Sequence, residues 1–340
     1  MGYSDDLKKS FYIINHKLTN SYTKLHRLIS RQVDPNDPTP LNKFELQNYA
    51  YYGFDDKFLR PKIWKIFLFY YSDNKFKNEL FYKERRKSYK EFKLQSIRNK
   101  EINVYIDDII HEDVNRTFLF PNADRTFCSF LDSKFVNDDK CLTHREIIKE
   151  ILLVFKTTNP GVDYVQGMNV LVTLIYYVFA NSDEYAHVES DTFFCFLNLI
   201  SEIGDYFLEI MDDKYVGISQ KLTRVIDIVK EFDPTLYNNM KSKKLTENLF
   251  HFRWILLSFA QEYPIDEVVW LWDRFLADST RFELVLYCAA AKIILLKNKI
   301  LKNEFSTCME ILQNNNEVDV KSMFYKADEM RRKMYGGNSD

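Results

Sequence analysis

The sequence predicts an all-α protein, and two observations lead to this fold class. The chain of 340 residues has only 8 glycines and 8 prolines, so residues that build tight turns are scarce. Apolar residues recur at helical spacing along most of the chain. No internal repeat of fixed period is present. A chain of this length can bury a large core, as one helical domain or as two lobes.

The N-terminal part of the chain predicts two helices. The first covers residues 6–32, and a linker with the sequence DPNDPTP follows at residues 34–40. The apolar residues of this first helix recur every three or four positions: Leu7, Phe11, Ile14 and Leu18. Residues 75–100 are strongly basic, with aromatic and apolar residues interleaved. This pattern favours the solvated face of a helix over a site for acidic lipid or an acidic protein partner.

The middle and C-terminal parts predict further helices. Thr143 and Glu146 form a capping box that opens a helix continuing through Phe155. The run Val170–Ala180 is apolar throughout, which predicts a buried helix, although its periodicity also permits a strand. The run is too short to span a bilayer. The remaining helices are expected at residues 191–203, 217–231, 247–262, 265–277 and 282–297.

Composition and missing motifs argue against several classes of function. The net charge of -2 gives no overall attraction to nucleic acid or acidic lipid. The five cysteines never form a CxxC pair, which argues against a disulfide framework or zinc cluster and indicates a reducing compartment. The chain has no HExxH pair, no GxSxG elbow and no kinase signature set. We therefore expect a cytoplasmic protein that lacks a complete catalytic site and a metal or cofactor of its own.

A glycine-containing loop, NPGVDYVQGMN, begins at Asn159 between two apolar segments. A Walker phosphate loop requires four residues between its glycines and Lys-Ser/Thr after the second. Here five residues separate the glycines, and Met168 and Asn169 follow Gly167, so the loop is not of this type. It instead presents the primary amide of Gln166. One interpretation is that this amide caps the following helix.

The stretch YIDDIIHEDVNRTF, Tyr105–Phe118, places a carboxylate at the end of an apolar helical stripe. The stripe consists of Ile106, Ile109, Ile110 and Asp113. A carboxylate there needs a partner, and Arg116 lies three residues further on the same side. The pair is either an ordinary surface ion pair or an arginine held by Asp113 and directed at another molecule's phosphate. The pattern alone favours the surface pair.

These two stretches together resemble the paired signature of TBC-domain proteins, which are GTPase-activating proteins of Rab GTPases. The first motif, IxxDxxRT, is formed by Ile110, Asp113, Arg116 and Thr117, and the second, YVQGMN, by Tyr164–Asn169. Upstream, LRPKIW contains an Arg and Trp pair, Arg60 and Trp64, similar to the one that opens the domain. Downstream, residues 252–275 resemble its closing motif. Two departures are Trp270, where many members carry Arg, and Phe194, where Trp is frequent.

The resemblance implies a domain organisation. Residues 41–300 are expected to form a two-lobed helical TBC domain, with the N-terminal catalytic lobe ending at about residue 205. Residues 1–40 are then a helical extension and linker, and residues 301–340 a C-terminal helical tail.

The resemblance also implies roles. Arg116 and Gln166 are the catalytic residues, which enter the nucleotide site of a GTP-bound Rab, where the arginine meets phosphate charge and the glutamine positions water. The supporting residues are Asp113, Thr117, Tyr164, Gly167, Asn169, Arg60 and Trp64. The chain is then a GTPase activator rather than an enzyme, acting at endomembranes, with GTP and Mg²⁺ carried by the Rab and membrane contact made through it. A non-catalytic helical Rab-binding scaffold is the alternative.

Overall fold

A computed structural model describes residues 23–29, 40–54, 56–71, 77–98, 104–117, 125–137, 140–182, 185–204, 216–314 and 318–336. These residues divide into two compact units, and the structure is all-helical apart from one short hairpin. Unit 1 contains the described residues up to Phe118, Arg125–Ser201 and Trp272–Ser279, and unit 2 contains the others. No helix in the described part of the chain combines the length and apolarity needed to cross a membrane.

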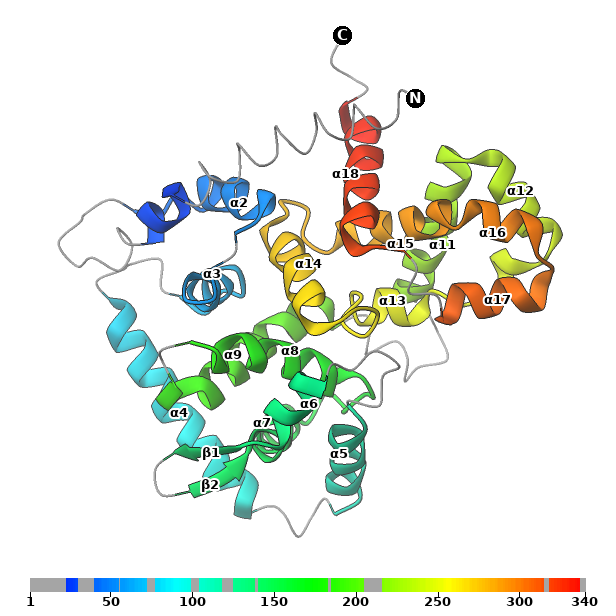
Figure 1. The fold of residues 1–340 in the computed structure, drawn as a ribbon. Coiled ribbons are helices and arrows are strands. Elements are labelled where there is room, and N and C mark those ends of the chain that lie inside the picture. The colour runs from blue at the N-terminus through cyan, green and yellow to red at the C-terminus, as the bar shows by residue number, and fades with distance from the viewer. Residues whose placement is uncertain are drawn as a thin grey trace. The chain divides into compact units, whose positions relative to one another are not determined.

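Unit 1 is built around one central helix, α7, which packs against α4, α5, α6 and α8 (Figure 1). Its helices are α2 (Lys43–Tyr52), α3 (Leu59–Phe67), α4 (Asn78–Arg98), α5 (Val104–Arg116), α6 (Arg125–Asp132), α7 (His144–Thr158), α8 (Met168–Ala180) and most of α9 (Val188–Ile203), which follows a 3-10 turn at Tyr185–His187. The predicted capping box is confirmed, because Thr143 Oγ1 accepts from the Glu146 amide and the Glu146 carboxylate accepts from the Thr143 amide. The apolar run of α8 is a helix and not a strand, and within it only Tyr177 is not fully buried.

In the N-terminal half of the chain, one predicted helix lies only partly within the described residues, and one hairpin was not predicted. Residues 23–29 are helical, but the rest of the predicted helix 6–32 and the linker up to Thr39 lie outside the described residues. A two-stranded antiparallel hairpin, which the sequence did not predict, precedes α7. It consists of β1 (Lys134–Asn137) and β2 (Lys140–Thr143), with Lys134 opposite Thr143. Strands of four residues are too short for their alternation to be distinguished from the helical periodicity around them.

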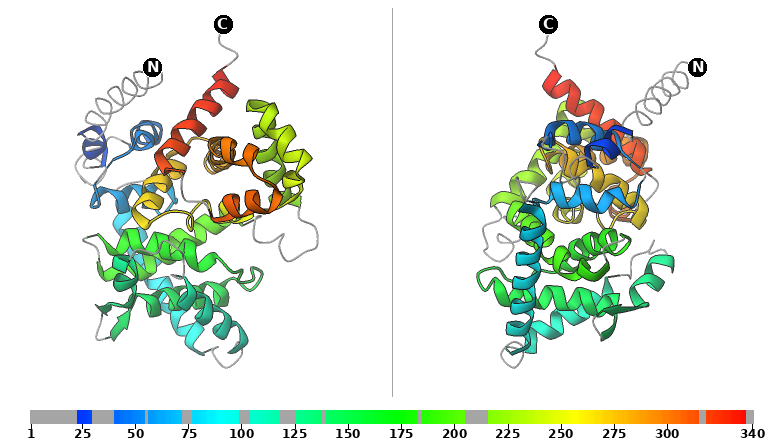
Figure 2. Two further views of the ribbon diagram at one scale, coloured as in Figure 1. Left: turned by 45° about the vertical axis from the view of Figure 1, so that its right-hand side comes forward. Right: turned by 90° about the vertical axis from the view of Figure 1, so that its left-hand side faces the viewer.

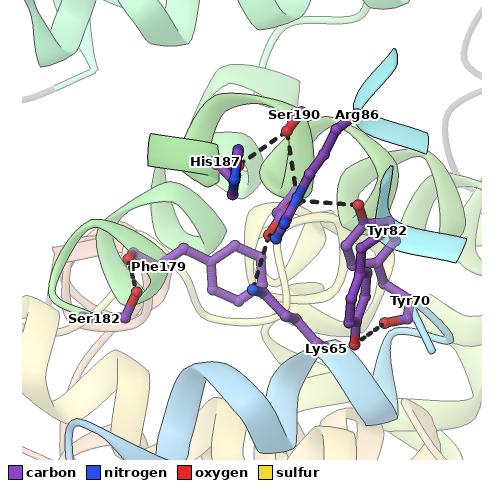
Figure 3. Close-up of polar contacts among 9 residues, drawn as sticks. Lys65, Tyr70, Tyr82, Arg86, Phe179, Ser182, His187 and Ser190 are labelled. Carbon is purple, nitrogen blue, oxygen red and sulfur yellow. Dashed lines mark hydrogen bonds and ion pairs between the residues drawn. The ribbon is translucent and has the colours of Figure 1, made fainter. Parts of the chain in front are cut away.

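A buried carboxylate joins α3, α4 and α9 within unit 1. Asp191 is 1% exposed and accepts hydrogen bonds from Arg86 at 2.9 and 3.1 Å and from the Tyr70 hydroxyl at 3.0 Å. The Lys65 ammonium lies 2.8 Å from the same carboxylate. Figure 3 shows Lys65, Tyr70 and Arg86 converging from different elements. Burial opposes ionisation, but Lys65 and Arg86 hold the pKa of Asp191 below its usual value.

In unit 2, α15 packs against α11 and α18, and α12 packs against α11 and α16 (Figure 1). Its elements are α11 (Val216–Phe232), α12 (Pro234–Ser242), a 3-10 turn (Leu245–Glu247), α13 (Phe252–Leu256), the first part of α14 (Ile265–Ala277), α15 (Glu283–Leu295), α16 (Lys297–Lys302), α17 (Phe305–Asn314) and α18 (Val320–Gly336). The helices expected at 191–203, 217–231 and 265–277 correspond to α9, α11 and α14. The helix expected at 282–297 ends earlier, and α16 follows it.

The predicted helix over residues 247–262 is wrong. Only the five residues of α13 are α-helical, and Ser258 and Phe259 have φ angles of 45° and 61°. A left-handed residue costs roughly 1–2 kcal/mol. The turn buries Phe259 in a stacked contact with the fully buried Trp254, with ring centroids 5.9 Å apart. The burial of these two aromatic side chains offsets the backbone cost.

Candidate functional site

The site begins with a buried carboxylate in the last turn of α5. The Asp113 side chain is 3% exposed. Its Oδ1 accepts from Arg116 Nη2 at 3.1 Å and its Oδ2 accepts from the Tyr164 hydroxyl at 3.0 Å. The pair of Asp113 and Arg116 is therefore not an ordinary surface ion pair, because its acidic partner lies in the interior.

Arg116 is the exposed partner of this pair. More than half of its side chain, 55%, is accessible to solvent. Its Nη2 also lies 3.5 Å from the carboxylate of Glu112. Within the described residues, Nε and Nη1 make no hydrogen bond, so one edge of the guanidinium is held and the other donors are available.

Asn169 ties the start of α8 to the end of α5. Its Nδ2 donates to the Asp113 carbonyl at 3.0 Å and to Thr117 Oγ1 at 2.6 Å. Its Oδ1 accepts from the Gly167 amide at 3.1 Å. Thr117 completes the network by donating its hydroxyl to the Asp113 carbonyl at 2.8 Å. Asn169 and Thr117 are both buried, so these bonds are made away from water.

Gly167 and Gln166 form the turn that precedes α8. Gly167 is the N-cap of α8 and has φ 106°, a conformation that favours glycine. Gly167 has no side chain to cap the helix, and the side chain that binds an amide at this end is Asn169, so the interpretation of Gln166 as a capping residue is wrong. Gln166 is exposed, and its side chain makes no hydrogen bond within the part of the chain that the structure describes.

The network surrounds both exposed side chains. Asp113 and Thr117 flank Arg116, whereas Tyr164 and Asn169 flank Gln166. Each residue of the first pair is hydrogen-bonded to a residue of the second pair. The two exposed side chains therefore rise from backbone segments that are fixed to each other.

Tyr164 is held in its donor form. It is mostly buried, and burial, followed by the neighbouring Asp113 carboxylate, raises the pKa of its phenol well above the ordinary value. The hydroxyl therefore remains protonated and continues to donate to Asp113 at physiological pH.

Two basic side chains of α7 support the site, and the sequence reasoning missed both. Arg145 donates to the Val114 carbonyl in the last turn of α5 at 2.8 Å and to Asp132 at 2.8 Å. Lys156 binds Asp163 in the loop before α8 at 2.5 Å. The contact between α7 and α5 joins residues 31 positions apart, and no local pattern in the sequence marks it.

Arg60 and Trp64 bind a different carboxylate. Arg60 Nε donates to both oxygens of Asp273 at 3.1 Å, and the Trp64 indole donates to Oδ1 at 2.7 Å. The Trp64 ring stacks with that of Trp272, with centroids 6.2 Å apart. Among the described residues, no hydrogen bond or ion pair joins this group to the Arg116 network. The two residues therefore belong to the packing of unit 1.

The two departures from the family pattern occupy packing positions. Phe194 stacks face to face on Tyr70, with ring centroids 5.8 Å apart and an interplanar angle of 7°. Trp270 is partly exposed and meets Phe324 of α18 edge-on at 5.4 Å. Neither residue lies in the Arg116 network.

The site contains one guanidinium and one primary amide in the open, with no cluster of ligands for a metal. Among the described residues, no group of three His, Cys, Asp or Glu side chains could hold a metal ion. An exposed cation and an exposed amide on fixed segments can donate to an anion and orient a water molecule.

Comparisons with known proteins identify the family. The model of the Rab-GTPase-TBC domain family matches residues 57–301. The chain is 37% identical over 206 residues, 60% of its length, to TBC1 domain family member 13 of Mus musculus. It is 24% identical over 271 residues, 72% of its length, to the GTPase-activating protein GYP1 of Saccharomyces cerevisiae. The matches span 52% of the first relative and 39% of the second, so the chain matches about half or less of these proteins.

Two solved structures share the fold. The Ypt/Rab-GAP domain of Gyp1p matches with a TM-score of 0.74 at 21% identity, over 94% of this chain and 99% of that one. The Chlamydomonas flagellar RabGAP TBC domain matches with a TM-score of 0.61 at 16% identity, over 96% and 95%. The resemblance inferred from the two motifs thus agrees with a family match that covers most of the chain. The chain belongs to the Rab-GTPase-TBC domain family.

Proposed function

We propose that this chain accelerates GTP hydrolysis by a Rab-family GTPase, to which it supplies Arg116 and Gln166. The observation that carries the proposal is the buried network around Asp113 and Asn169, which fixes two segments while leaving these two side chains exposed. The names of its relatives support the same activity, since GYP1 is a GTPase-activating protein and the Gyp1p structure is a Ypt/Rab-GAP domain.

Arg116 acts on the charge of the transferring phosphate. Phosphoryl transfer spreads negative charge over the γ-phosphate oxygens, and a planar guanidinium meets that charge with several fixed donors. The ion pair with Asp113 holds one edge of the group before the partner arrives. Less conformational freedom is then lost when the transition state forms.

Gln166 acts on the attacking water. Its carbonyl oxygen accepts a hydrogen bond from the water and its amide nitrogen donates to a phosphate oxygen. The exposed position on the turn before α8 leaves both groups free for this task. In this proposal GTP and Mg²⁺ belong to the bound Rab, and the chain holds neither by itself. The Rab would place the activity at the cytoplasmic face of endomembranes.

A panel of GTP-loaded Rab proteins tests the proposal in single-turnover hydrolysis assays. We expect the chain to accelerate phosphate release from at least one of them. A double variant, Arg116→Ala with Gln166→Ala, should lose the acceleration while its unfolding temperature stays close to that of the native chain. Binding of a GTP-loaded Rab without any acceleration across the panel would favour the non-catalytic scaffold instead.

A further inference from the structure

The outward face of α4 carries a regular stripe of exposed side chains. The stripe consists of Leu80, Lys83, Lys87, Lys90, Leu94 and Ile97, which follow one another at intervals of three and four residues. Side chains at these intervals lie on one side of a helix. All six are exposed, and the apolar ones reach 57% for Leu80, 56% for Leu94 and 48% for Ile97. We call this set the outer stripe.

A neighbouring face of α4, the inner face, is anchored to the core of unit 1. Arg86 binds Asp191, and Lys93 binds Glu150 and Glu189. In Figure 3 the Arg86 side chain extends from α4 toward Lys65. Tyr89 is buried and donates to Glu189 at 2.7 Å. The helix is therefore fixed by its inner face and runs along the outside of unit 1 (Figure 2).

Five of the seven basic residues of α4 fall into two groups: Arg86 and Lys93 on the inner face, and the three lysines of the outer stripe. Those on the inner face are paired with carboxylates, whereas the three lysines of the outer stripe make no ion pair within the described residues. The helix has seven basic and three acidic side chains, a net charge of +4, in a chain whose net charge is -2. The positive charge is a local property of this helix and not of the whole protein.

We propose that the outer stripe binds the surface of an anionic lipid bilayer. Lysine carries its charge on a long apolar stem, so it can rest against apolar surface while its ammonium group stays at the level of the headgroups. The leucines and the isoleucine lie toward the two ends of the stripe and would enter the boundary with the acyl chains. Basic side chains close to a negatively charged leaflet are each attracted to it.

The arrangement of the stripe favours a bilayer over a helical protein partner. Its spacing is that of a coiled-coil seam, but its three central positions are lysines, which such a seam would have to bury. A bilayer surface leaves the ammonium groups hydrated. From Leu80 to Ile97 the stripe is about 26 Å long, enough to meet several headgroups in a row.

Vesicle flotation tests the proposal, and it needs no GTPase, so its result does not depend on the proposed function. The full chain would be mixed with vesicles of phosphatidylcholine alone or with vesicles that also contain about 30% phosphatidylserine, whose charge gives the membrane a negative surface potential. We expect binding to the second kind only, and loss of binding at high salt. The variant Lys83→Gln/Lys87→Gln/Lys90→Gln should bind about 100-fold more weakly, since each lysine near the surface contributes about a fivefold effect.

A matched control separates the stripe from net charge. Lys62→Gln/Lys241→Gln/Lys302→Gln removes the same charge from exposed lysines of other helices and should leave binding unchanged. Leu80→Gln/Leu94→Gln should weaken binding without altering its salt dependence. Equal binding to both kinds of vesicle, or equal loss in the stripe and control variants, would overturn the proposal. If the chain does not bind the anionic vesicles but binds a polyglutamate peptide tightly, the proposal is overturned and the stripe is a site for an acidic protein partner.

Discussion

Arg116 and Asp113 share one ion pair but have different surroundings, and this difference determines what each can do. Asp113 is buried and both of its oxygens are occupied, so it has no capacity for a ligand. Arg116 is half-exposed and has donors that no described residue uses. At the scale of single residues, Asp113 holds one edge of the Arg116 guanidinium, and Arg116 keeps donors exposed to solvent.

Replacing Arg116 by Lys tests this assignment. Lysine keeps the charge but lacks the planar fork, so we expect the stimulated rate of GTP hydrolysis to fall about 10³-fold or more, in the range of an arginine finger. Single-turnover assays on a Rab that the native chain activates would measure it. Arg224→Lys, at a partly exposed position in α11, is the control and should keep full activity. Near-native activity of Arg116→Lys would refute the assignment.

Replacing Gln166 by Ala tests the second exposed side chain. If the amide positions water, its contacts are stronger in the transition state than in the ground state. Gln166→Ala should therefore retain most affinity for GTP-loaded Rab but lose the tighter binding to Rab carrying GDP and a metal-fluoride mimic of the phosphate. Calorimetry on a cognate pair would measure both affinities. Equal binding of the native chain and the variant to Rab carrying GDP and the mimic would contradict this role and favour the non-catalytic scaffold.

His251 makes the stability of the chain depend on pH. Burial lowers its pKa to about 4, although a hydrogen bond from Nε2 to the Leu222 carbonyl at 3.0 Å acts in the other direction. Its Nδ1 has no partner among the described residues, so a proton there would be a charged group in the core. In the unfolded chain the pKa is about 6.5. The unfolded state therefore binds more protons between these two values, and stability falls as the pH drops through this window.

The titration of His251 alone is expected to lower the free energy of unfolding by about 2 kcal/mol from pH 7 to pH 5. Urea unfolding at several pH values would measure it. The variant His251→Gln cannot titrate at this position, so its stability should change less over the same range, even if it is less stable throughout. His111→Gln, at an exposed histidine of α5, should follow the native chain. The same slope in the native chain and in His251→Gln would show that another group is responsible.

At the scale of elements, the site is a junction between the end of one helix and the start of another. The last turn of α5 and the first turn of α8 come from different parts of the chain, and Asn169 bonds across them. Arg145 binds the carbonyl of Val114 at the same helix end, where a positive charge also interacts favourably with the helix dipole. The precision of the site thus depends on the packing of α5, α7 and α8.

Asn169→Ala should loosen this junction. It removes three hydrogen bonds from a buried position, and we expect a loss of about 2–3 kcal/mol of stability together with a lower rate of stimulated hydrolysis. Chemical unfolding and the hydrolysis assay would measure the two effects. Asn181→Ala at the other end of α8 is the matched control, because its single bond to the Tyr177 carbonyl is exposed. A fully stable and fully active Asn169→Ala would show that the junction does not position the site.

At the scale of the whole molecule, the chain returns to unit 1 after passing through unit 2. Residues 272–279 belong to unit 1, where Trp272 stacks on Trp64 and Asp273 binds Arg60. These late residues lie beyond the lobe boundary expected at about residue 205. Contacts between residues more than 200 positions apart are thus part of the core of unit 1.

A fragment of residues 23–204 should therefore fail to fold cooperatively. Without residues 272–279, the indole of Trp64 loses its hydrogen-bond acceptor and its stacking partner, and removing a large buried aromatic side chain typically costs about 3–5 kcal/mol. We expect calorimetry to show a cooperative transition for the full chain and none for the fragment. A fragment that melts cooperatively near the temperature of the full chain would show that the late segment is dispensable.

The sequence by itself determined the features that depend on neighbours in the chain. Helical periodicity predicted both ends of α11 and α14 to within one residue and the start of α9 to within three. The capping box fixed the start of α7, because both signals act within one or two turns. The pairing of the two family motifs was equally clear, whereas the apolar run of α8 predicted a helix but also permitted a strand. These local features were sufficient to predict the fold class and the family.

Only the tertiary structure decided which of these residues meet. Nothing near Asp113 in the sequence shows that it is buried against Tyr164, which lies 51 positions further along the chain. Periodicity likewise extended a helix through Ser258 and Phe259, where the packing of Trp254 and Phe259 imposes a left-handed turn. The reason is the same in both cases: burial is a property of the assembled core, and the free energy it contributes can outweigh the local preference of the backbone.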